Sequence, residues 1–326
     1  MPLFATVAML AIVASAVWYS IVFPRQPFKG PLPALEHEDV RLAHSLQEHV
    51  TAVASQPHNI EYYDALEAAA HYIERSLIQF GLKPQAQIFA VADKSVRNIE
   101  VVWEPVDSTT VTPSIVIGAH YDSPGDAPGA NDNGTGVAAA LELAHRLANF
   151  TPATHRLRLA FWVNEERPYG KTPDMGSWQH AKALKDSREN IEGMIALETI
   201  GYFSNEPNSQ DFPVPFGLIY PKKGNFIAFV GLPGSRSFLH RALGHFRSHT
   251  QFPSIGGVAP GFLEGIDLSD HWAFHHFGFP AMMVTDTAPF RNPYYHELDD
   301  LPENVDYESL ARVTRGLEKM LRKLLA

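Results

Sequence analysis

The sequence predicts a single α/β domain with a mixed, mostly parallel central sheet that is flanked by helices on both faces. Short apolar runs bounded by turn residues alternate with segments of helical periodicity, a pattern typical of parallel strands joined by crossover helices. The chain has 326 residues and is 45% hydrophobic and 19% charged, so it is large enough to bury a substantial core. In such a sheet, ligands bind beyond the carboxyl ends of the strands.

The chain begins with an apolar segment that lies outside this domain. Residues 1–24 contain no charged side chain, and the apolar run over 3–23 is long enough to cross a bilayer as a helix. A buried core helix is the alternative, but the proline-rich residues 25–34 that follow favour a membrane segment and a linker. We therefore expect a signal-anchor at 1–24, a linker at 25–34 and the folded domain at 35–326.

The sequence leaves open whether this segment is cleaved and how it is oriented. Ala14-Ser15-Ala16 resembles a cleavage site, but the apolar run continues past it, which favours an uncleaved anchor. The first basic residues, Arg25 and Lys29, follow the segment, so a positive-inside count alone would keep the domain in the cytoplasm. We expect export, and thus a membrane-anchored protein that faces the periplasm or the exterior.

The elements of the domain follow in order. An amphipathic helix is predicted over 62–80, where Gly81 ends it, and a closing helix over 307–325 carries an apolar stripe that suits docking on the sheet. A further helical run, 137–147, follows a loop rich in Gly and Asn. Strands are predicted at 98–103, 114–119, 157–163, 194–197 and 281–284.

Charge and cysteine content exclude several functions. The formal net charge is −10 and no basic patch is visible, which argues against a nucleic-acid partner. The chain has no cysteine, so it has neither disulfides nor thiolate metal ligands nor a cysteine nucleophile. Any metal site must use His, Asp and Glu.

Two polar clusters follow the second predicted strand. His120 ends this strand, and Asp122 is placed to accept a hydrogen bond from the far nitrogen of its ring. Asp132 lies in the loop Gly129-Ala130-Asn131-Asp132-Asn133-Gly134, where glycines let the backbone turn sharply towards a ligand. Either cluster alone also fits a solvated loop or a helix cap.

A third cluster, Glu165 and Glu166, directly follows another strand. Adjacent carboxylates repel each other and gain nothing from burial unless a cation compensates them. One of them can bind a metal while its neighbour takes a proton from water. Glu198 and His296 follow two further strands, and each alone would be unremarkable. Their joint occurrence at successive strand ends indicates a shared site.

The segments that carry these residues resemble peptidase family M28, zinc peptidases that include bacterial leucyl-type aminopeptidases. The matching pieces span roughly residue 35 to the C-terminus and occur in the family's order; they are GAHYDS, GANDNGTG, WVNEER, ALETIGY, SDHWAFHHFGFPA and YYHELDD. The resemblance implies two zinc ions, one held by His120 and Glu198 and the other by Glu166 and His296, with Asp132 bridging both. It also implies that Glu165 is the general base.

The same resemblance assigns supporting residues and an activity. Asp122 would support His120, and Asp270 or Asp300 would support the opposite side of the site. The implied activity is that of an aminopeptidase, which removes N-terminal residues from peptide substrates through a metal-bridging hydroxide; zinc suits such imidazole and carboxylate ligands. The chain departs from the family pattern at two places. Many members have Asp in place of Glu198, which has a longer side chain. The segment 167–177 is expected to shape the substrate pocket, so the side-chain preference of the family does not simply carry over.

Two rival functions belong to relatives of this family. Glutaminyl cyclases are acyltransferases with similar ligands and usually one functional zinc, but they tend to place Trp before the last His, where this chain has Tyr295. Receptor-like ectodomains of the family typically lose ligands or the base, and here none is missing. We therefore expect a peptidase.

Overall fold

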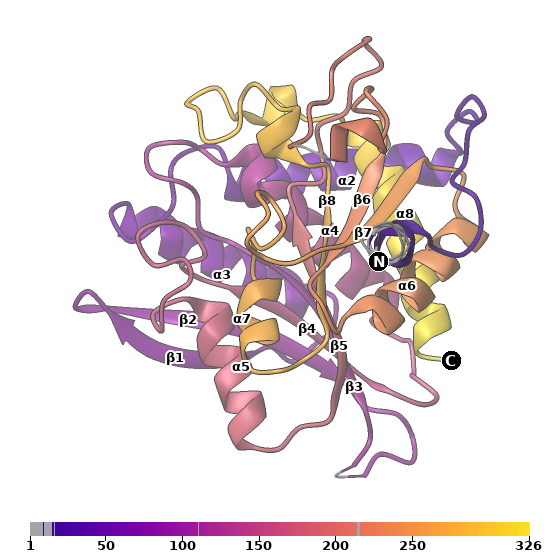
Figure 1. The fold of residues 1–326 in the computed structure, drawn as a ribbon. Coiled ribbons are helices and arrows are strands. Elements are labelled where there is room, and N and C mark those ends of the chain that lie inside the picture. Colours follow the sequence, from indigo (N-terminus) through magenta and orange to yellow (C-terminus); the bar gives the residue numbers. More distant parts are fainter. Residues whose placement is uncertain (1–8, 10–14, 16, 110, 214–215) are drawn as a thin grey trace.

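The central sheet sets the position of every predicted site residue. The computed structural model describes residues 17–109, 111–213 and 216–326, together with residues 9 and 15 (Figure 1). Within this part of the chain the sheet has eight strands in the order β1-β2-β4-β3-β5-β8-β6-β7. The strands are β1 (Gln85–Val91), β2 (Lys94–Trp103), β3 (Ser114–His120), β4 (Arg156–Trp162), β5 (Ile191–Glu198), β6 (Ile227–Gly231), β7 (Ser254–Val258) and β8 (Ala281–Thr285).

The four central strands, β4, β3, β5 and β8, run parallel to their neighbours. The β6/β7 pair is also parallel, whereas β1/β2, β2/β4 and β6/β8 are antiparallel. The sheet is thus mixed and mostly parallel in its centre, as the sequence predicts. Since parallel strands end at one edge, the residues after β3, β4, β5 and β8 are brought together there.

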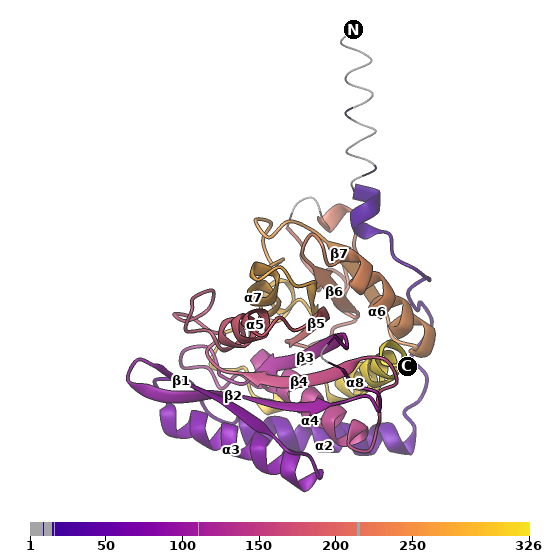
Figure 2. The same ribbon diagram turned by 90° about the horizontal axis from the view of Figure 1, so that it is seen from below.

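Helices cover both faces of the sheet (Figures 1 and 2). One face packs against α2 (His37–Val53), α3 (Tyr63–Gln79), α4 (Thr135–Leu147), α6 (Arg236–His249) and α8 (Tyr307–Leu324). The other face packs against α5 (Gly176–Asp186) and α7 (His271–His276). Alternate residues of a strand serve opposite cores: Ile115 and Ile117 belong to the first apolar cluster and Val116 to the second. Burial on both faces explains why these strands are continuously apolar.

The predicted elements agree with the observed ones to within a few residues. The helix predicted over 62–80 is α3, and the closing helix over 307–325 is α8. The sequence pattern did not predict β1, β6 and β7. β1 alternates exposed and partly buried residues at one edge of the sheet, and β6 and β7 have only five residues each, so their apolar signal is weak.

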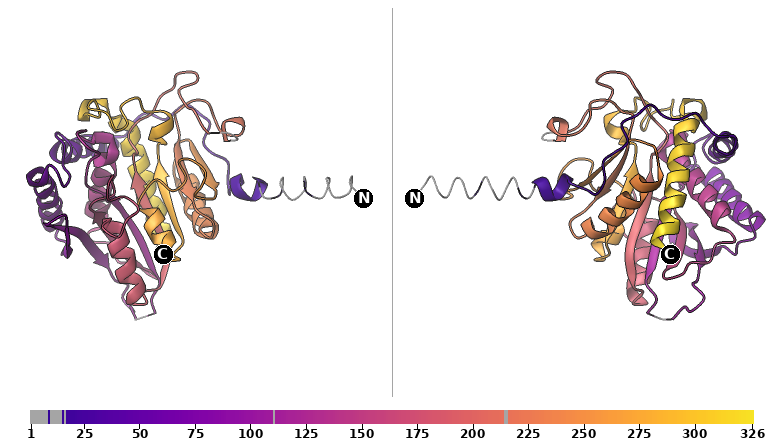
Figure 3. Two further views of the ribbon diagram at one scale, coloured as in Figure 1. Left: turned by 60° about the vertical axis from the view of Figure 1, so that its left-hand side comes forward. Right: turned by 90° about the vertical axis from the view of Figure 1, so that its right-hand side faces the viewer.

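The predicted membrane segment, 1–24, falls largely outside the described residues. Residues 17–21 form a helical turn, and the chain then passes along α6 towards the domain (Figure 3). Among the residues that the structure describes, no helix combines the length and apolarity needed to span a bilayer. The signal-anchor at 1–24 and the linker at 25–34 stay predictions.

Candidate functional site

The predicted site residues meet at the carboxyl edge of the sheet. His120 is the last residue of β3 and Glu198 the last residue of β5, and these two strands are neighbours. Glu165 and Glu166 follow β4, which lies on the other side of β3, and His296 lies in the loop after β8. His120 and His296 are 176 residues apart in the sequence. In the fold, both of their rings lie beside the carboxylate of Asp132.

That shared carboxylate, Asp132, is held by a rigid loop before α4. The flanking side chain of Asn133 donates to the Leu197 carbonyl (2.8 Å) and accepts from the Thr199 amide (3.1 Å). A Cβ on Gly129, whose φ is +73°, would lie 2.4 Å from the Asp132 carbonyl oxygen. The glycine and asparagine content noted in the sequence is thus what lets the loop approach β5 so closely.

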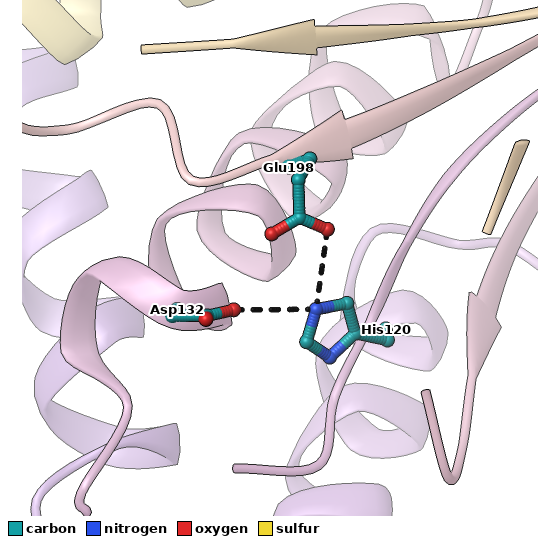
Figure 4. Close-up of side chains that lie close together, drawn as sticks. All are labelled: His120, Asp132 and Glu198. Atoms are coloured by element: carbon teal, nitrogen blue, oxygen red, sulfur yellow. Dashed lines mark ion pairs between the residues drawn. The ribbon is translucent and has the colours of Figure 1, made fainter. Parts of the chain in front are cut away.

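Two groups of potential metal donors share Asp132. In the first, the Nε2 atom of His120 lies 3.4 Å from Asp132 Oδ1 and 3.4 Å from Glu198 Oε2 (Figure 4). In the second, His296 Nε2 lies 3.0 Å from Asp132 Oδ2 and 3.7 Å from Glu166 Oε1. One oxygen of Asp132 faces each group, so a bridging carboxylate between two cation positions is sterically available.

The contact of Asp122 differs in detail from the sequence prediction. The His120 Nδ1 atom is 3.1 Å from the Asp122 backbone carbonyl and 3.6 Å from its carboxylate. That carboxylate instead accepts the backbone N–H groups of Glu165 (3.0 Å) and Glu166 (3.1 Å). Asp122 therefore orients the imidazole through its main chain and fixes the two glutamates through its side chain.

Of the two candidates for the opposite side, Asp300 makes the supporting contacts. Its carboxylate accepts the backbone N–H groups of Asn131 (2.9 Å) and Asp132 (3.0 Å), which fixes the loop that carries Asp132. Asp270 is fully buried near the same site, but neither of its carboxylate oxygens has a hydrogen-bond partner among the described residues. Ser269, its neighbour, donates to Glu198 (2.8 Å).

Backbone strain concentrates at these residues. Thr199, directly after Glu198, has a φ of +44°, and Asn164, directly before Glu165, has a φ of +61°. His296 itself has a φ of +61°. Left-handed conformations of non-glycine residues cost on the order of 1–3 kcal/mol and persist where the surroundings hold them, typically at functional sites. Thr199, a β-branched residue, is the most unusual of the three.

The site contains more carboxyl groups than its two imidazoles can neutralise. Burial, together with the charges of Asp132 and Glu165, raises the pKa of Glu166 well above its usual value. Burial likewise raises the pKa of Glu165, and the negative charge of Glu198 adds to this. Although burial opposes a charged imidazole, the charge of Glu198 helps to raise the pKa of His120. Crowded carboxyl groups of this kind are stabilised by a nearby positive charge.

Buried atoms without partners show that the donors fit a metal. His120 Nε2, Asp132 Oδ1 and Glu166 Oε1 are buried and lack a hydrogen-bond partner among the described residues. Such groups cost free energy unless they are satisfied, and imidazole nitrogens and carboxylate oxygens are ligands that zinc accepts. Three carboxylates in the two groups, with Glu165 beside them, would carry four negative charges when all are ionised, which bound divalent cations would offset.

A narrow apolar cavity, with a volume of about 70 Å³, adjoins this edge of the sheet. Glu198 and Tyr295 lie at its inner end, and its walls include Phe229, Met283 and Phe290. The segment 167–177, which we expected to shape the pocket, contributes none of the described residues that line this cavity. The walls come instead from β6, β7, β8 and the loops beside them, and of these strands the sequence connected only β8 with the site.

Several residues that shape the site were missed at the level of sequence. Asn131 accepts from the Gly201 amide (2.9 Å) and donates to Asp286 (3.0 Å), and Asn133 clamps the same loop to β5. Tyr295 stacks on His296, with ring centroids 3.9 Å apart. For Asn131 and Asn133, the available signal in the sequence was the density of asparagines around Asp132. The role of Tyr295 depends on the fold alone.

Comparisons with known proteins agree with this geometry. The model of peptidase family M28 matches residues 98–321. The uncharacterized protein YfbL of Escherichia coli (strain K12) is 33% identical over 306 residues, which cover 91% of this chain and 92% of YfbL. A probable zinc metalloprotease of Pyrenophora tritici-repentis is 27% identical over 227 residues, or 61% of this chain; the match spans 45% of that protein, so the chain corresponds to about half of it.

Solved structures with the same fold are more distant in sequence. BSAP, a zinc aminopeptidase from Bacillus subtilis, superposes with a TM-score of 0.69 at 14% identity and covers 90% of this chain and 96% of its own. A glutaminyl cyclase from Fimbriiglobus ruber superposes with a TM-score of 0.62 at 16% identity, over 91% and 99% of the two chains. At this level of identity the likeness concerns the fold.

Proposed function

The chain belongs to peptidase family M28 and is a peptide hydrolase, and from this premise we propose that it is an aminopeptidase that uses two zinc ions. The observation that carries the proposal is the pair of donor groups that share Asp132, one completed by His120 and Glu198 and the other by Glu166 and His296. Each group offers three donor atoms within 4.8 Å of one another. Such sets match the imidazole and carboxylate ligands of zinc.

The proposed mechanism assigns a separate task to Glu165. When bound, the two ions would supply a hydroxide nucleophile near neutral pH and polarise the scissile carbonyl. Glu165 has a raised pKa, mainly through burial, and its backbone N–H is held by Asp122. A carboxyl group with a pKa shifted towards neutrality can accept a proton from water and then donate it to the leaving amine. We therefore propose Glu165 as the general base.

The apolar cavity supports a preference for apolar N-terminal residues. It starts at Glu198, beside the proposed metal position, and its walls are mostly aromatic and aliphatic. We propose that the cavity receives the first side chain of the peptide. A profile of the amino acids released from a peptide library tests this, and equal release of Asp and Leu would contradict it.

The peptidase proposal is tested by metal removal and replacement. We expect chelation to abolish hydrolysis of leucyl anilide and zinc to restore it, with a stoichiometry of two ions per chain. Cyclisation of a peptide with N-terminal Gln should be absent, although a cyclase shares the fold. Efficient cyclisation without hydrolysis, together with one bound ion, would replace the aminopeptidase proposal by the cyclase alternative.

The raised pKa values predict how pH affects the metal-free protein. Burial raises the pKa of Asp300 to about 7, and the pKa values of Glu166, Glu198 and both imidazoles are raised as well. Groups whose pKa is higher in the folded state stabilise it at low pH and lose this effect as the pH rises through the folded value. Between pH 5.5 and 8 the metal-free protein should therefore lose stability.

Thermal melts measure this loss directly. The Tm of the metal-free protein should be lower at pH 8 than at pH 5.5, and the rise in Tm on addition of zinc should be larger at pH 8. The variant Glu198→Gln, which removes one crowded carboxylate, should show a weaker dependence on pH. A metal-free Tm that rises over this interval would be the contrary result.

We also propose, from the sequence, that the protein is anchored by residues 1–24 with its domain in the periplasm or outside the cell. The uncharged composition of this segment supports anchoring. Protection of the domain from protease in intact cells, followed by digestion after the outer barrier is opened, would be expected for a periplasmic domain. Protection that persists in intact spheroplasts would contradict export.

A further inference from the structure

The outer end of the apolar cavity lies beside the start of the described chain. Ser20 and Ile21, in the helical turn at 17–21, line the cavity together with Phe216 and Tyr220. The short helix η2 (Phe216–Leu218) contributes Phe216 to this lining. One cavity therefore connects the proposed metal site with the segment predicted to enter the membrane.

Exposed apolar side chains surround this end of the cavity. Leu218 is 87% exposed and Phe262 is 86% exposed, which is unusual for residues of this size. Both lie within a few residues of positions that line the cavity, as do the exposed residues Trp18, Tyr19 and Ile219. We call these five residues the apolar rim. Where such side chains adjoin one another, they mark an interaction site.

The N-terminal turn is fixed to the domain next to the rim. Arg236 of α6 donates to the backbone carbonyls of Tyr19 (2.6 Å) and Val22 (2.9 Å), and its guanidinium lies 4.1 Å from the centre of the Tyr19 ring. Arg247 donates to the carbonyls of Pro24 (3.1 Å) and Arg25 (2.9 Å). Phe23, between these contacts, is buried. No flexible spacer therefore separates residue 19 from the domain.

We propose that the apolar rim docks on the surface of a lipid bilayer. The inference rests on the proposed anchoring by residues 1–24: if that segment enters the bilayer, the contacts of Arg236 and Arg247 hold the domain against the membrane surface beside Trp18 and Tyr19. Trp and Tyr favour the interface between lipid and water, and Leu and Phe gain free energy by entering it. Glu264, which lies near Phe262 and lines the cavity, limits the docking to the headgroup level.

This orientation has a consequence for substrates. The cavity is lined both by Ser20 and Ile21, next to the rim residues Trp18 and Tyr19 in the sequence, and by Glu198 of the proposed metal site. Peptides with apolar N-terminal residues concentrate at bilayer surfaces, because their side chains leave water there. The docked enzyme meets such peptides where they accumulate.

The absence of cysteine makes the proposal directly testable. Leu218→Cys and Phe262→Cys each create a unique attachment site for an environment-sensitive fluorophore such as NBD. Ile88→Cys in β1 and Ile78→Cys in α3 are matched controls, since these residues are also apolar and exposed (68% and 60%) but lie at the end of the domain away from the N-terminal turn (Figure 2). The full chain is reconstituted into phosphatidylcholine and phosphatidylglycerol vesicles with or without doxyl-labelled lipid.

We expect blue-shifted emission, and quenching by shallow doxyl groups that is several-fold stronger at positions 218 and 262 than at 78 and 88. Equal quenching at all four positions would overturn the proposal, as would failure of the full chain to sediment with vesicles. A blue shift at 218 and 262 without doxyl quenching would show that protein, such as a second copy of the chain, covers the rim, and would also overturn it. None of these readouts depends on peptidase activity, so the outcome is independent of the proposed catalytic function.

Discussion

Replacing Asp132 with Asn is expected to remove both metal ions and to abolish hydrolysis. Asp132 is the one residue shared by the two donor groups, with Oδ1 near His120 and Oδ2 near His296. The hydrogen bonds and charges of the two imidazoles, acting against burial, lower the pKa of Asp132, so it is the carboxylate that stays charged in the crowded site. Asparagine keeps the size of the side chain but loses the charge and one oxygen ligand.

The measurement is metal content by elemental analysis, together with hydrolysis of leucyl anilide at saturating zinc. Asp93→Asn is the matched control: Asp93 is exposed in the turn between β1 and β2, and its φ of +62° suits asparagine. This control should keep two ions and full activity. If the Asp132→Asn variant retained one ion and substantial activity, Asp132 would not bridge and the second position would be dispensable.

Replacing Glu165 with Gln should lower kcat by about 10²–10⁴-fold, the range usual for loss of a general base, while both metal ions remain bound. The expectation follows from the position of Glu165: its carboxylate lies within 4.8 Å of donor atoms of His120 and Glu166, but it is absent from the two groups that share Asp132. The isosteric amide cannot accept the proton, yet it leaves the two groups intact.

Three variants distinguish this role from metal binding. Glu166→Gln should lose metal as well as activity, because Glu166 belongs to the group with His296. Glu48→Gln, at an exposed position of α2, should change neither. The acidic limb of the pH profile of kcat should disappear in Glu165→Gln if this carboxyl titrates during catalysis. A variant with normal kcat would exclude Glu165 as the base.

The number of ions separates the two functions that this fold supports. A cyclase of this fold usually has one functional zinc, whereas the proposed two-metal peptidase uses all five ligands, including His120 and Glu198. In the structure these two side chains face each other at 3.4 Å, with Ser269 holding the glutamate. The longer side chain of Glu198, where many family members have Asp, thus still reaches the site. This geometry supports the two-ion proposal.

Much of the fold was predictable because its central strands are buried on both faces. Such strands appear in the sequence as continuous apolar runs. This pattern predicted the strands β3, β4, β5 and β8. The edge strand β1 and the short strands β6 and β7 have weaker patterns, because exposure and length dilute the apolar signal. The cavity wall, which these short strands help to form, was missed with them.

The sequence by itself predicted which residues form the candidate site, since acids and histidines after apolar strands are brought to the carboxyl edge of a parallel sheet. Only the tertiary structure shows how the donor groups and the supporting contacts are divided among these residues. The division of Asp132 between two donor groups, the contact of Asp122 with the amides of Glu165 and Glu166, and the path of the cavity from Glu198 to Ile21 all join segments far apart along the chain. Such contacts depend on strand order and loop geometry, which local residue patterns do not encode.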